Sequence, residues 1–302
     1  MKIEESLLHV SEHIQKENWK SYSWTDQKAF VCSVMANLAY TKISEWELEE
    51  NSNVKLLPSH TYYELLKSKR INSQKYFSLL ETDEHLLIER PGAVLVATKI
   101  NNVVFIAMRG TRLLSISDWR VNLNAKKVSP FPPHQGVKVH KGFYLEAKSF
   151  HEELVDEMHK REWDKFPVYF VGHSLGGALA AITYAMYDNY WLTSNVHRRL
   201  LRNNHCACYT FGMPRWGNAN AIAVLKSPTH FFVENDPVPH VPTTSLGYSD
   251  CTNNISIDSN SFSYVKYNGL LVQIKDYLHL TVSNKFKDHF IETYVERLFQ
   301  KL

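Results

Sequence analysis

Apolar residues in the first third of the chain recur at helical spacing. Between Ser21 and Trp46 they fall three and four positions apart, which predicts an amphipathic helix with its apolar face turned inward. Residues 59–80 mix leucines and aromatic residues with lysines, a pattern typical of helix. No motif with recognisable chemistry occurs in this third. We therefore expect residues 1–90 to form a helical N-terminal region that packs on the rest of the chain, with a role facing substrate or a partner as the alternative.

The pattern changes at Pro91, where short apolar runs that favour strands begin. Val94–Thr98 and Val103–Met108 flank Asn101-Asn102 and predict a β-hairpin with a two-residue turn. Strand-like runs then alternate with helical segments, which indicates an α/β fold with a mainly parallel central sheet flanked by helices, residues 1–302 forming one domain. The expected strands are Phe166–Val171, Cys206–Phe211 and His230–Val233; the expected helices are 144–161, the segment after Ser174, and 285–302, with Phe290, Tyr294, Val295 and Leu298 on its apolar stripe.

Residues 172–176 (Gly-His-Ser-Leu-Gly) follow one of these strands and open a helix rich in small residues. They fit the G-x-S-x-G nucleophile elbow, in which a serine occupies a strained strand-to-helix turn. Glycine is required at both flanks because a side chain there would collide with neighbouring backbone. The turn would place the Ser174 hydroxyl at a helix N-terminus, where free N–H groups can stabilise an oxyanion. The alternative is a glycine-rich turn with an incidental serine.

A serine nucleophile needs a histidine base and an acid that orients the base. In enzymes with this elbow the acid and then the base follow the serine along the chain. Asp236 lies at the end of a predicted strand and is the expected acid, with a turn-capping role as the alternative. His240 follows too closely to arrive from another loop, and His279 lies in an apolar run. His289, just before the last helix, is the favoured base, and His279 is the alternative.

Composition narrows the classes of protein that fit. With 302 residues and 44% apolar content, the chain can bury a sizeable core, and a net charge of +3 without a basic run gives no reason to expect nucleic acid as a partner. No apolar run approaches the roughly 18 residues of a membrane span, and residues 1–6 lack the basic and apolar regions typical of a signal peptide. We expect a cytoplasmic protein, or one exported without a cleavable N-terminal signal. The four cysteines predict neither a disulfide framework nor a metal site.

Six motifs, in the right order, resemble those of the class 3 lipases, the fungal-type lipase branch of the α/β-hydrolases. The resemblance covers roughly residues 27–298 and is loosest in the helical N-terminal region, where it rests mainly on residues 36–40. It implies an α/β-hydrolase fold. The segments that carry it are Arg109-Gly110-Thr111 with Asp118-Trp119 and Asn122, Val139–Phe143, Gly172–Ala180, Phe211–Asn218, Asn235–Pro242, and Asp288-His289 with Tyr294.

The resemblance also implies roles for single residues. Ser174 corresponds to the nucleophile and Asp236 to the orienting acid. His289 corresponds to the base, which favours it over His279. Four further motif residues are expected to be structural, three of them bracing loops around the site and the last packing in the elbow: His140, Arg215, Asn218 and His173.

An oxyanion hole and a lid are implied by the same resemblance. Thr111 and the backbone N–H of Leu175 fall where the family places the two oxyanion donors, and losing one donor in such a site typically costs about 3 kcal/mol. The segment after Thr111 corresponds to the lid, in which Leu113, Leu114 and Ile116 would form an apolar cover over the site. The alternative is a surface helix that uses those residues for ordinary packing.

These features together predict a serine hydrolase that cleaves fatty-acyl esters of glycerolipids through an acyl-enzyme, without a metal or organic cofactor. A triacylglycerol lipase or carboxylesterase is expected, with phospholipase A1 acting on glycerophospholipids as the alternative. The substrate would be met at a membrane or droplet surface. A catalytically silent lipid-binding protein and an acyltransferase are weaker alternatives, because no triad member is lost and the sequence shows no acceptor pocket. The sequence does not indicate an oligomeric state.

Overall fold

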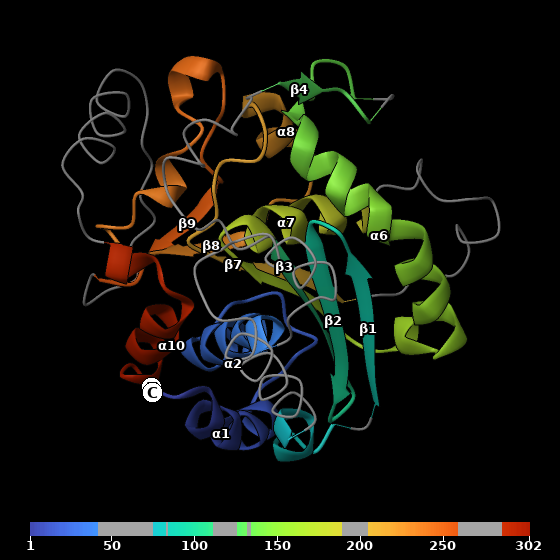
Figure 1. The fold of residues 1–302 in the computed structure, drawn as a ribbon, viewed down its shortest axis with the longest axis vertical. Helices are drawn as coiled ribbons and strands as arrows, with labels where there is room; N and C mark the ends of the chain where they lie inside the picture. The colour runs from blue at the N-terminus through green and yellow to red at the C-terminus, as the bar shows by residue number, and fades with distance from the viewer. Residues whose placement is uncertain (42–74, 83, 111–125, 132–133, 189–204, 259–285) are drawn as a thin grey trace, which may run out of the picture.

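A seven-stranded sheet forms the centre of the structure (Figure 1). The computed structural model describes residues 1–41, 75–82, 84–110, 126–131, 134–188, 205–258 and 286–302. The strand order in the sheet is β1-β2-β3-β6-β7-β8-β9. These strands are β1 Glu84–Arg90, β2 Ala93–Ile100, β3 Val103–Gly110, β6 Val168–His173, β7 Cys206–Phe211, β8 Thr229–Phe232 and β9 Asn253–Ser256, and a separate pair is β4 Lys127–Val128 with β5 Val139–His140.

The hairpin that the sequence predicts is formed by β2 and β3. Asn101 and Asn102 have φ values of 48° and 62°, the left-handed conformation that a two-residue hairpin turn requires and that Asn tolerates. From β3 to β9, neighbouring strands are parallel. The prediction of a mainly parallel sheet is therefore confirmed.

β1 is an edge strand that the sequence did not predict. It pairs antiparallel with β2 along its whole length, whereas helix was expected up to residue 90, so that prediction was wrong. Residues 86–88 (Leu-Leu-Ile) form a short apolar run that fits a helix or a strand equally well. The exposed edge of the β2–β3 hairpin decides between them, because its unpaired backbone groups offer β1 a ladder of hydrogen bonds.

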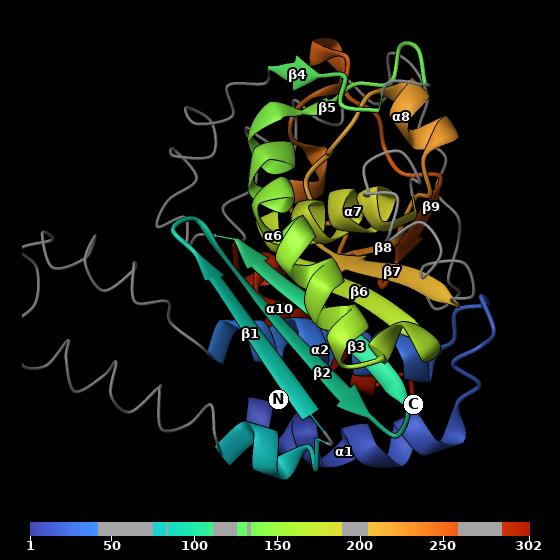
Figure 2. The same cartoon turned by 90° about the vertical axis from the view of Figure 1, so that its right-hand side faces the viewer.

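Helices cover both faces of the sheet (Figure 2). α1, α2 and α10 pack against one face, and α6 and α7 lie on the other. The helices are α1 Ile3–Lys16, α2 Asp26–Leu38, α6 Lys141–Lys160, α7 Leu175–Asp188, α8 Ala219–Val224 and α10 Ile291–Phe299, and the short 3₁₀ helices are η1 Ala39–Thr41, η2 Trp163–Lys165, η5 Val238–His240, η6 Thr244–Leu246 and η7 Phe286–His289.

α2 is buried around its whole circumference rather than along one stripe. Every residue from Lys28 to Leu38 is buried, because the sheet, α1 and α10 enclose the helix. The helix begins at Asp26, where the Thr25 hydroxyl accepts a hydrogen bond from the Lys28 N–H at 3.1 Å. The prediction of an amphipathic helix starting at Ser21 was therefore wrong in its start and in its pattern.

α10 closes the same face at the other end of the chain. Its buried residues are Ile291, Tyr294, Val295 and Leu298. Phe290 was expected on this stripe, but it precedes the first turn and is 58% exposed, so that part of the prediction was wrong. The Met1 ammonium group lies 3.5 Å from a carboxylate oxygen of α10, so the two ends of the chain meet on one face.

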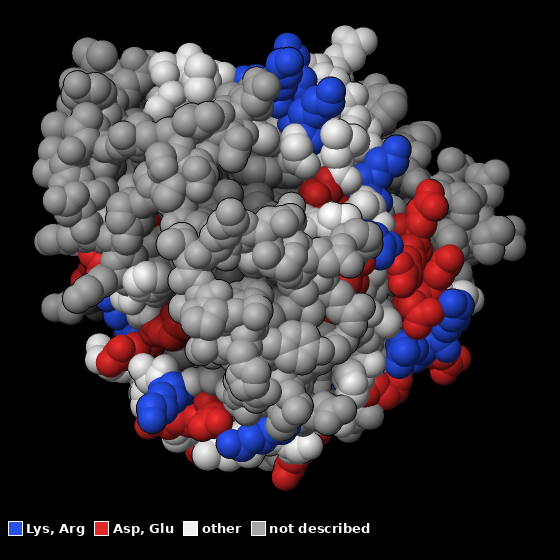
Figure 3. All heavy atoms as spheres, viewed as in Figure 1, with Lys and Arg blue, Asp and Glu red and all other residues white. Residues whose placement is uncertain are grey.

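The described surface carries charges of both signs. Figure 3 shows acidic and basic side chains next to one another over α6. Among the described helices, none combines the length and the apolar character that a membrane crossing requires. All four cysteines are buried and free.

The enclosure of α2 gives a first prediction. Phe30 has no exposed surface and lies 5.4 Å from the Phe299 ring of α10, between ring centroids. We expect Phe30→Ala to lower the free energy of unfolding by about 3–5 kcal/mol, since a buried ring is lost and a cavity remains. Urea unfolding would measure it. Leu8→Ala is the control, because Leu8 of α1 is 63% exposed and its loss should change stability by less than about 0.5 kcal/mol. Equal effects of the two variants would contradict the burial of α2.

Candidate active site

Ser174 stands between the end of β6 and the start of α7. Its φ of 56° lies in the left-handed region that residues with a side chain rarely adopt. The flanking glycines permit the turn. A Cβ atom on Gly172 would lie 2.2 Å from the Gly176 carbonyl oxygen, and one on Gly176 would lie 2.1 Å from the Met108 carbonyl oxygen in β3. Both obstacles are backbone, so steric exclusion makes this strand-to-helix turn possible only with glycine at these two positions.

His289, the last residue of η7, lies near the C-terminus of the chain and contacts Ser174. Its Nε2 lies 2.9 Å from the Ser174 hydroxyl oxygen, and its Nδ1 lies 2.8 Å from Oδ2 and 3.0 Å from Oδ1 of Asp236. A carboxylate can only accept hydrogen bonds, so Nδ1 donates and the Nε2 lone pair faces the serine. This is the tautomer that a general base for Ser174 requires.

Asp236 lies in the turn after β8 and has no exposed surface. The Val238 N–H donates to its Oδ1 at 2.9 Å, and the Tyr294 hydroxyl donates to its Oδ2 at 2.5 Å. With the His289 ring, three donors therefore converge on one buried carboxylate. Such donors are what make a buried negative charge tolerable. The turn-capping role that the sequence left open coexists with the contact to His289.

Tyr294 of α10 is a site residue to which the sequence assigned no role beyond its place in a motif and on an apolar stripe. Burial and then the charge of Asp236 raise the pKa of its hydroxyl, so it remains a proton donor. Gly212, at the end of β7 with a φ of 54°, makes room for the pair. A Cβ atom on Gly212 would lie 2.7 Å from Asp236 Oδ2 and 2.8 Å from the Tyr294 hydroxyl. A tyrosine on an apolar helix stripe was the available signal, because its hydroxyl needs a buried partner.

The predicted oxyanion and lid residues are only partly described. Leu175 is the first residue of α7, so its N–H is one of the helix N-terminal groups that have no acceptor within the helix. It adjoins Ser174, where such a donor would be needed. The others lie outside the described residues: Thr111, Leu113, Leu114, Ile116 and the alternative base His279.

Loops beside the site are braced by three polar residues. His140 caps α6, its Nδ1 accepting from the Phe143 N–H at 3.3 Å. Asn218 caps α8 through its Oδ1 and donates to the Gly136 carbonyl. Arg215 is buried, pairs with Asp250 at 2.7 Å and donates to the His240 carbonyl at 2.7 Å. These contacts give the three residues the bracing role that the sequence indicated.

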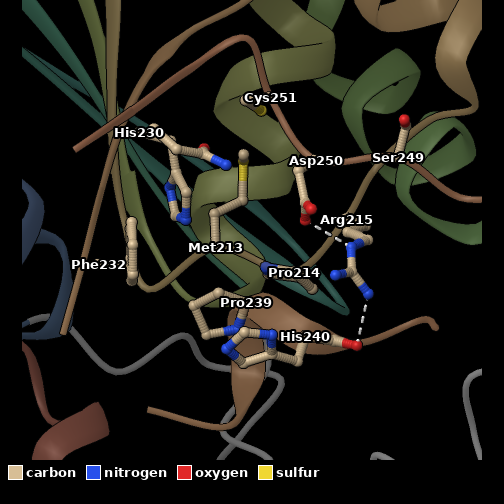
Figure 4. Close-up of a pocket in the computed structure, with 11 residues that line it drawn as sticks. Met213, Pro214, Arg215, His230, Phe232, Pro239, His240, Ser249, Asp250 and Cys251 are labelled. Atoms are coloured by element: carbon tan, nitrogen blue, oxygen red, sulfur yellow. Dashed lines mark hydrogen bonds and ion pairs between the residues drawn. The ribbon is translucent and has the colours of Figure 1, made fainter. Parts of the chain in front are cut away.

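A small cavity beside the loop that follows Asp236 is separate from the serine and histidine (Figure 4). Arg215 is one of the lining residues, and the figure shows its guanidinium bound to Asp250 and to the His240 carbonyl. His230 and Asn254 are also among the residues that line it. None of Ser174, Asp236 and His289 borders it, so the hydrogen-bonded chain of these three, and not this cavity, is the candidate active site.

Comparison with known proteins points to one family. Residues 105–246 match the family model described as lipase (class 3). A lipase from Rhizomucor miehei is 31% identical over 181 residues, which make up 58% of this chain and 47% of that protein. The chain therefore spans about half the length of this curated relative.

Two solved structures share the fold. A mutant form of MDLA from Penicillium cyclopium has a TM-score of 0.56 at 20% identity, with 89% of this chain and 95% of that chain covered. A triacylglycerol lipase whose catalytic centre is described as a serine protease triad has a TM-score of 0.51 at 23% identity, with 71% and 82% covered.

The sheet order, the elbow at Ser174 and these structural likenesses define an α/β-hydrolase fold. Residues 105–246 match the class 3 lipase family model, and the Rhizomucor relative that the chain resembles is a lipase. The resemblance seen in the sequence motifs is confirmed.

Buried histidines around the site predict acid sensitivity. Burial lowers the pKa of His140 and of His230 from 6.5 to about 4, so between these values the unfolded chain binds protons that the folded chain does not. Stability is therefore complete above about pH 6.5 and falls as the pH drops toward 4, by roughly 3 kcal/mol for each histidine. Urea unfolding across this range would measure it.

The matched variant is His140→Asn, which keeps a side-chain acceptor for the cap of α6 but has no titrating group. Its stability should fall less steeply between about pH 6.5 and 4 than that of the parent protein. A parent protein of constant stability over this range would contradict the neutral burial of both histidines.

Proposed function

We propose that this protein is a lipase that hydrolyses fatty-acyl esters of glycerolipids through an acyl-enzyme. The observation that carries the proposal is the continuous hydrogen-bonded chain from Ser174 through His289 to buried Asp236. Serine, base and acid arrive from three separate segments of the chain, each at a sheet end or helix start. Their convergence at a strained strand-to-helix turn has an immediate chemical use and no evident structural one.

In the acylation half, the Ser174 hydroxyl oxygen attacks the ester carbonyl carbon while its proton passes to Nε2 of His289. The Nδ1–H of the resulting imidazolium continues to donate to Asp236, which stabilises the new positive charge without taking the proton. The carbonyl oxygen becomes an oxyanion beside the N-terminus of α7, where the Leu175 N–H is a donor. Collapse of this intermediate expels the glyceride alkoxide, which takes the proton from Nε2 and leaves as an alcohol.

The deacylation half repeats the same steps with water. His289 Nε2 takes a proton from a water molecule, whose oxygen attacks the acyl-enzyme carbonyl carbon. The second intermediate collapses, the bond to Ser174 breaks, and the serine oxygen recovers the proton from Nε2. A fatty acid is released and the resting site is restored. Thr111, outside the described residues, remains the proposed second oxyanion donor.

Triacylglycerol is the proposed substrate class in preference to glycerophospholipid. The relatives that the chain resembles are named as a lipase and a triacylglycerol lipase, and none of these names refers to phospholipid. A lipid–water interface is then the expected place of action, since such substrates hardly dissolve as single molecules. The proposed lid at Leu113, Leu114 and Ile116 belongs to that same interpretation.

Replacement of the nucleophile tests the mechanism. Ser174→Ala should lower kcat on p-nitrophenyl esters at least about 10⁴-fold, because it removes the hydroxyl that contacts Nε2 of His289. Ser149→Ala is the control, since Ser149 lies on the exposed side of α6 and its loss should leave kcat unchanged. Activity that survives in Ser174→Ala would overturn the proposal.

Substrate class can be decided by direct comparison. Emulsified triacylglycerol, phosphatidylcholine vesicles and p-nitrophenyl esters of graded chain length are offered to the same preparation, and released fatty acid or nitrophenol is measured. We expect the largest kcat/KM on triacylglycerol and a preference for long over short acyl chains. Faster turnover of phosphatidylcholine would assign the protein as a phospholipase instead.

The space occupied by the acid gives a further prediction. Gly212→Ala should lower kcat by about 100-fold or more, because the new Cβ would push Asp236 or Tyr294 out of place. Gly247→Ala is a matched control. Gly247 also has a positive φ, 74°, but among the described residues its Cβ would meet just the end of the Lys127 side chain at 3.4 Å, so the substitution should cost about 1 kcal/mol of stability and little activity. Similar activities of the two variants would show that the crowding at Gly212 is unimportant.

A further inference from the structure

His173 lies directly behind the proposed base. It is the last residue of β6 and directly precedes Ser174. The ring is 4% exposed, and its centroid lies 4.7 Å from that of His289. Its Nε2 lies 2.6 Å from the backbone carbonyl oxygen of His289, and its Nδ1 lies 3.0 Å from the hydroxyl of Tyr40 in η1.

These contacts fix the tautomer of His173. A carbonyl oxygen can only accept, so Nε2 must carry the proton that it donates to His289. In a neutral ring Nδ1 is then an acceptor, and the Tyr40 hydroxyl must donate to it. The same hydroxyl lies 3.3 Å from the His173 carbonyl oxygen, a longer contact than the one to the ring. The donors thus run in one direction, from Tyr40 to His173 and from His173 to His289.

The neutral form of His173 is also the form that the site needs. Burial, and then the neighbouring His289, lower the pKa of His173 well below its ordinary value. A cation at this position would oppose the positive charge that His289 carries during turnover. Among the described residues, the Tyr294 ring also lies against His173, with 5.7 Å between centroids, and burial raises the pKa of its hydroxyl. His173 can therefore donate a hydrogen bond to the backbone of His289 without adding a charge beside it.

We propose that Tyr40 and His173 are positioning residues that hold the backbone of His289, so that its ring stays aligned between Ser174 and Asp236. Asp236 fixes the rotation of the imidazole from the Nδ1 side, whereas His173 fixes the main chain that carries it. The inference rests on the proposed function, because alignment matters only if His289 is the base. Tyr40 belongs to the N-terminal region. On this proposal that region helps to align the active site, in addition to the packing role expected for it.

Three variants test the proposal. Tyr40→Phe removes only the hydroxyl, His173→Phe keeps a ring without a donor, and His173→Gln restores a donor near the position of Nε2. We expect kcat on a p-nitrophenyl ester to fall about threefold to tenfold in Tyr40→Phe, the factor that a neutral hydrogen bond typically contributes, and further in His173→Phe. His173→Gln should recover most of the loss. KM should stay within about twofold in all three, since the contact does not touch substrate.

A matched control separates positioning from general stability. Tyr169 lies on the same face of β6 and donates one buried hydrogen bond to the Trp19 carbonyl at 3.0 Å, away from the triad. Tyr169→Phe should lower the free energy of unfolding about as much as Tyr40→Phe does, yet leave kcat unchanged. An equal loss of kcat in both variants, or full kcat in Tyr40→Phe and His173→Phe, would overturn the positioning role.

A readout without turnover keeps this inference distinct from the proposed function. The proton on His289 Nδ1, held against Asp236, should give a downfield proton resonance in the parent protein. In His173→Phe that resonance should broaden through faster exchange with water, and in Tyr169→Phe it should persist. If Ser174→Ala keeps its activity the proposed function fails, whatever the resonance shows. If Ser174→Ala is inactive but the resonance is unchanged in His173→Phe, only the positioning role fails.

Discussion

The close approach of α7 to β3 is the constraint on which the site depends. Ser174 can stand at a helix N-terminus, with a strained backbone, only because glycines occupy the positions where the turn and the first residues of α7 meet neighbouring backbone. Gly176 meets the Met108 carbonyl oxygen, and Gly172 meets Gly176 itself. At the end of β3, Gly110 lies under the Leu175 side chain, where a Cβ would come within 2.3 Å of it. A single methyl group at any of these positions would move the serine hydroxyl relative to His289.

The acid and the base are held by contacts of a different kind. Asp236 is buried, and its charge is tolerable because His289, Tyr294 and the Val238 N–H all donate to it. Those same donors leave the carboxylate one orientation, which sets the tautomer of His289. The same hydrogen bonds therefore stabilise the buried charge of Asp236 and align the ring of His289. Removing any donor would cost stability and orientation together, so a fall in activity alone cannot separate the two effects without a matched control.

Much of this site was predictable from residue types and order, and the parts that were not share a physical reason. The glycines on either side of Ser174 indicate its role, and the position of Asp236 after a predicted strand indicates that of the acid. His289 could not be separated from His279 by chemistry alone, because side-chain direction depends on how the last helix docks. β1 and the all-round burial of α2 depend on neighbours distant in the chain, as does the contact of His173 with the His289 carbonyl. A local sequence pattern does not show which distant segments of the chain will pack together.

The face that holds α2 and α10 joins the two ends of the chain. α2 packs against α10, more than two hundred residues away, and the Met1 ammonium group lies near the last helix. Contacts at such separation close a very long loop. We therefore expect the assembly of this face to be the slow step of folding. Tyr294 lies in the core of this face, and His289 lies just before α10. A folding intermediate with an ordered sheet would thus present Ser174 without its base, and catalytic competence would arrive only with the last long-range contacts.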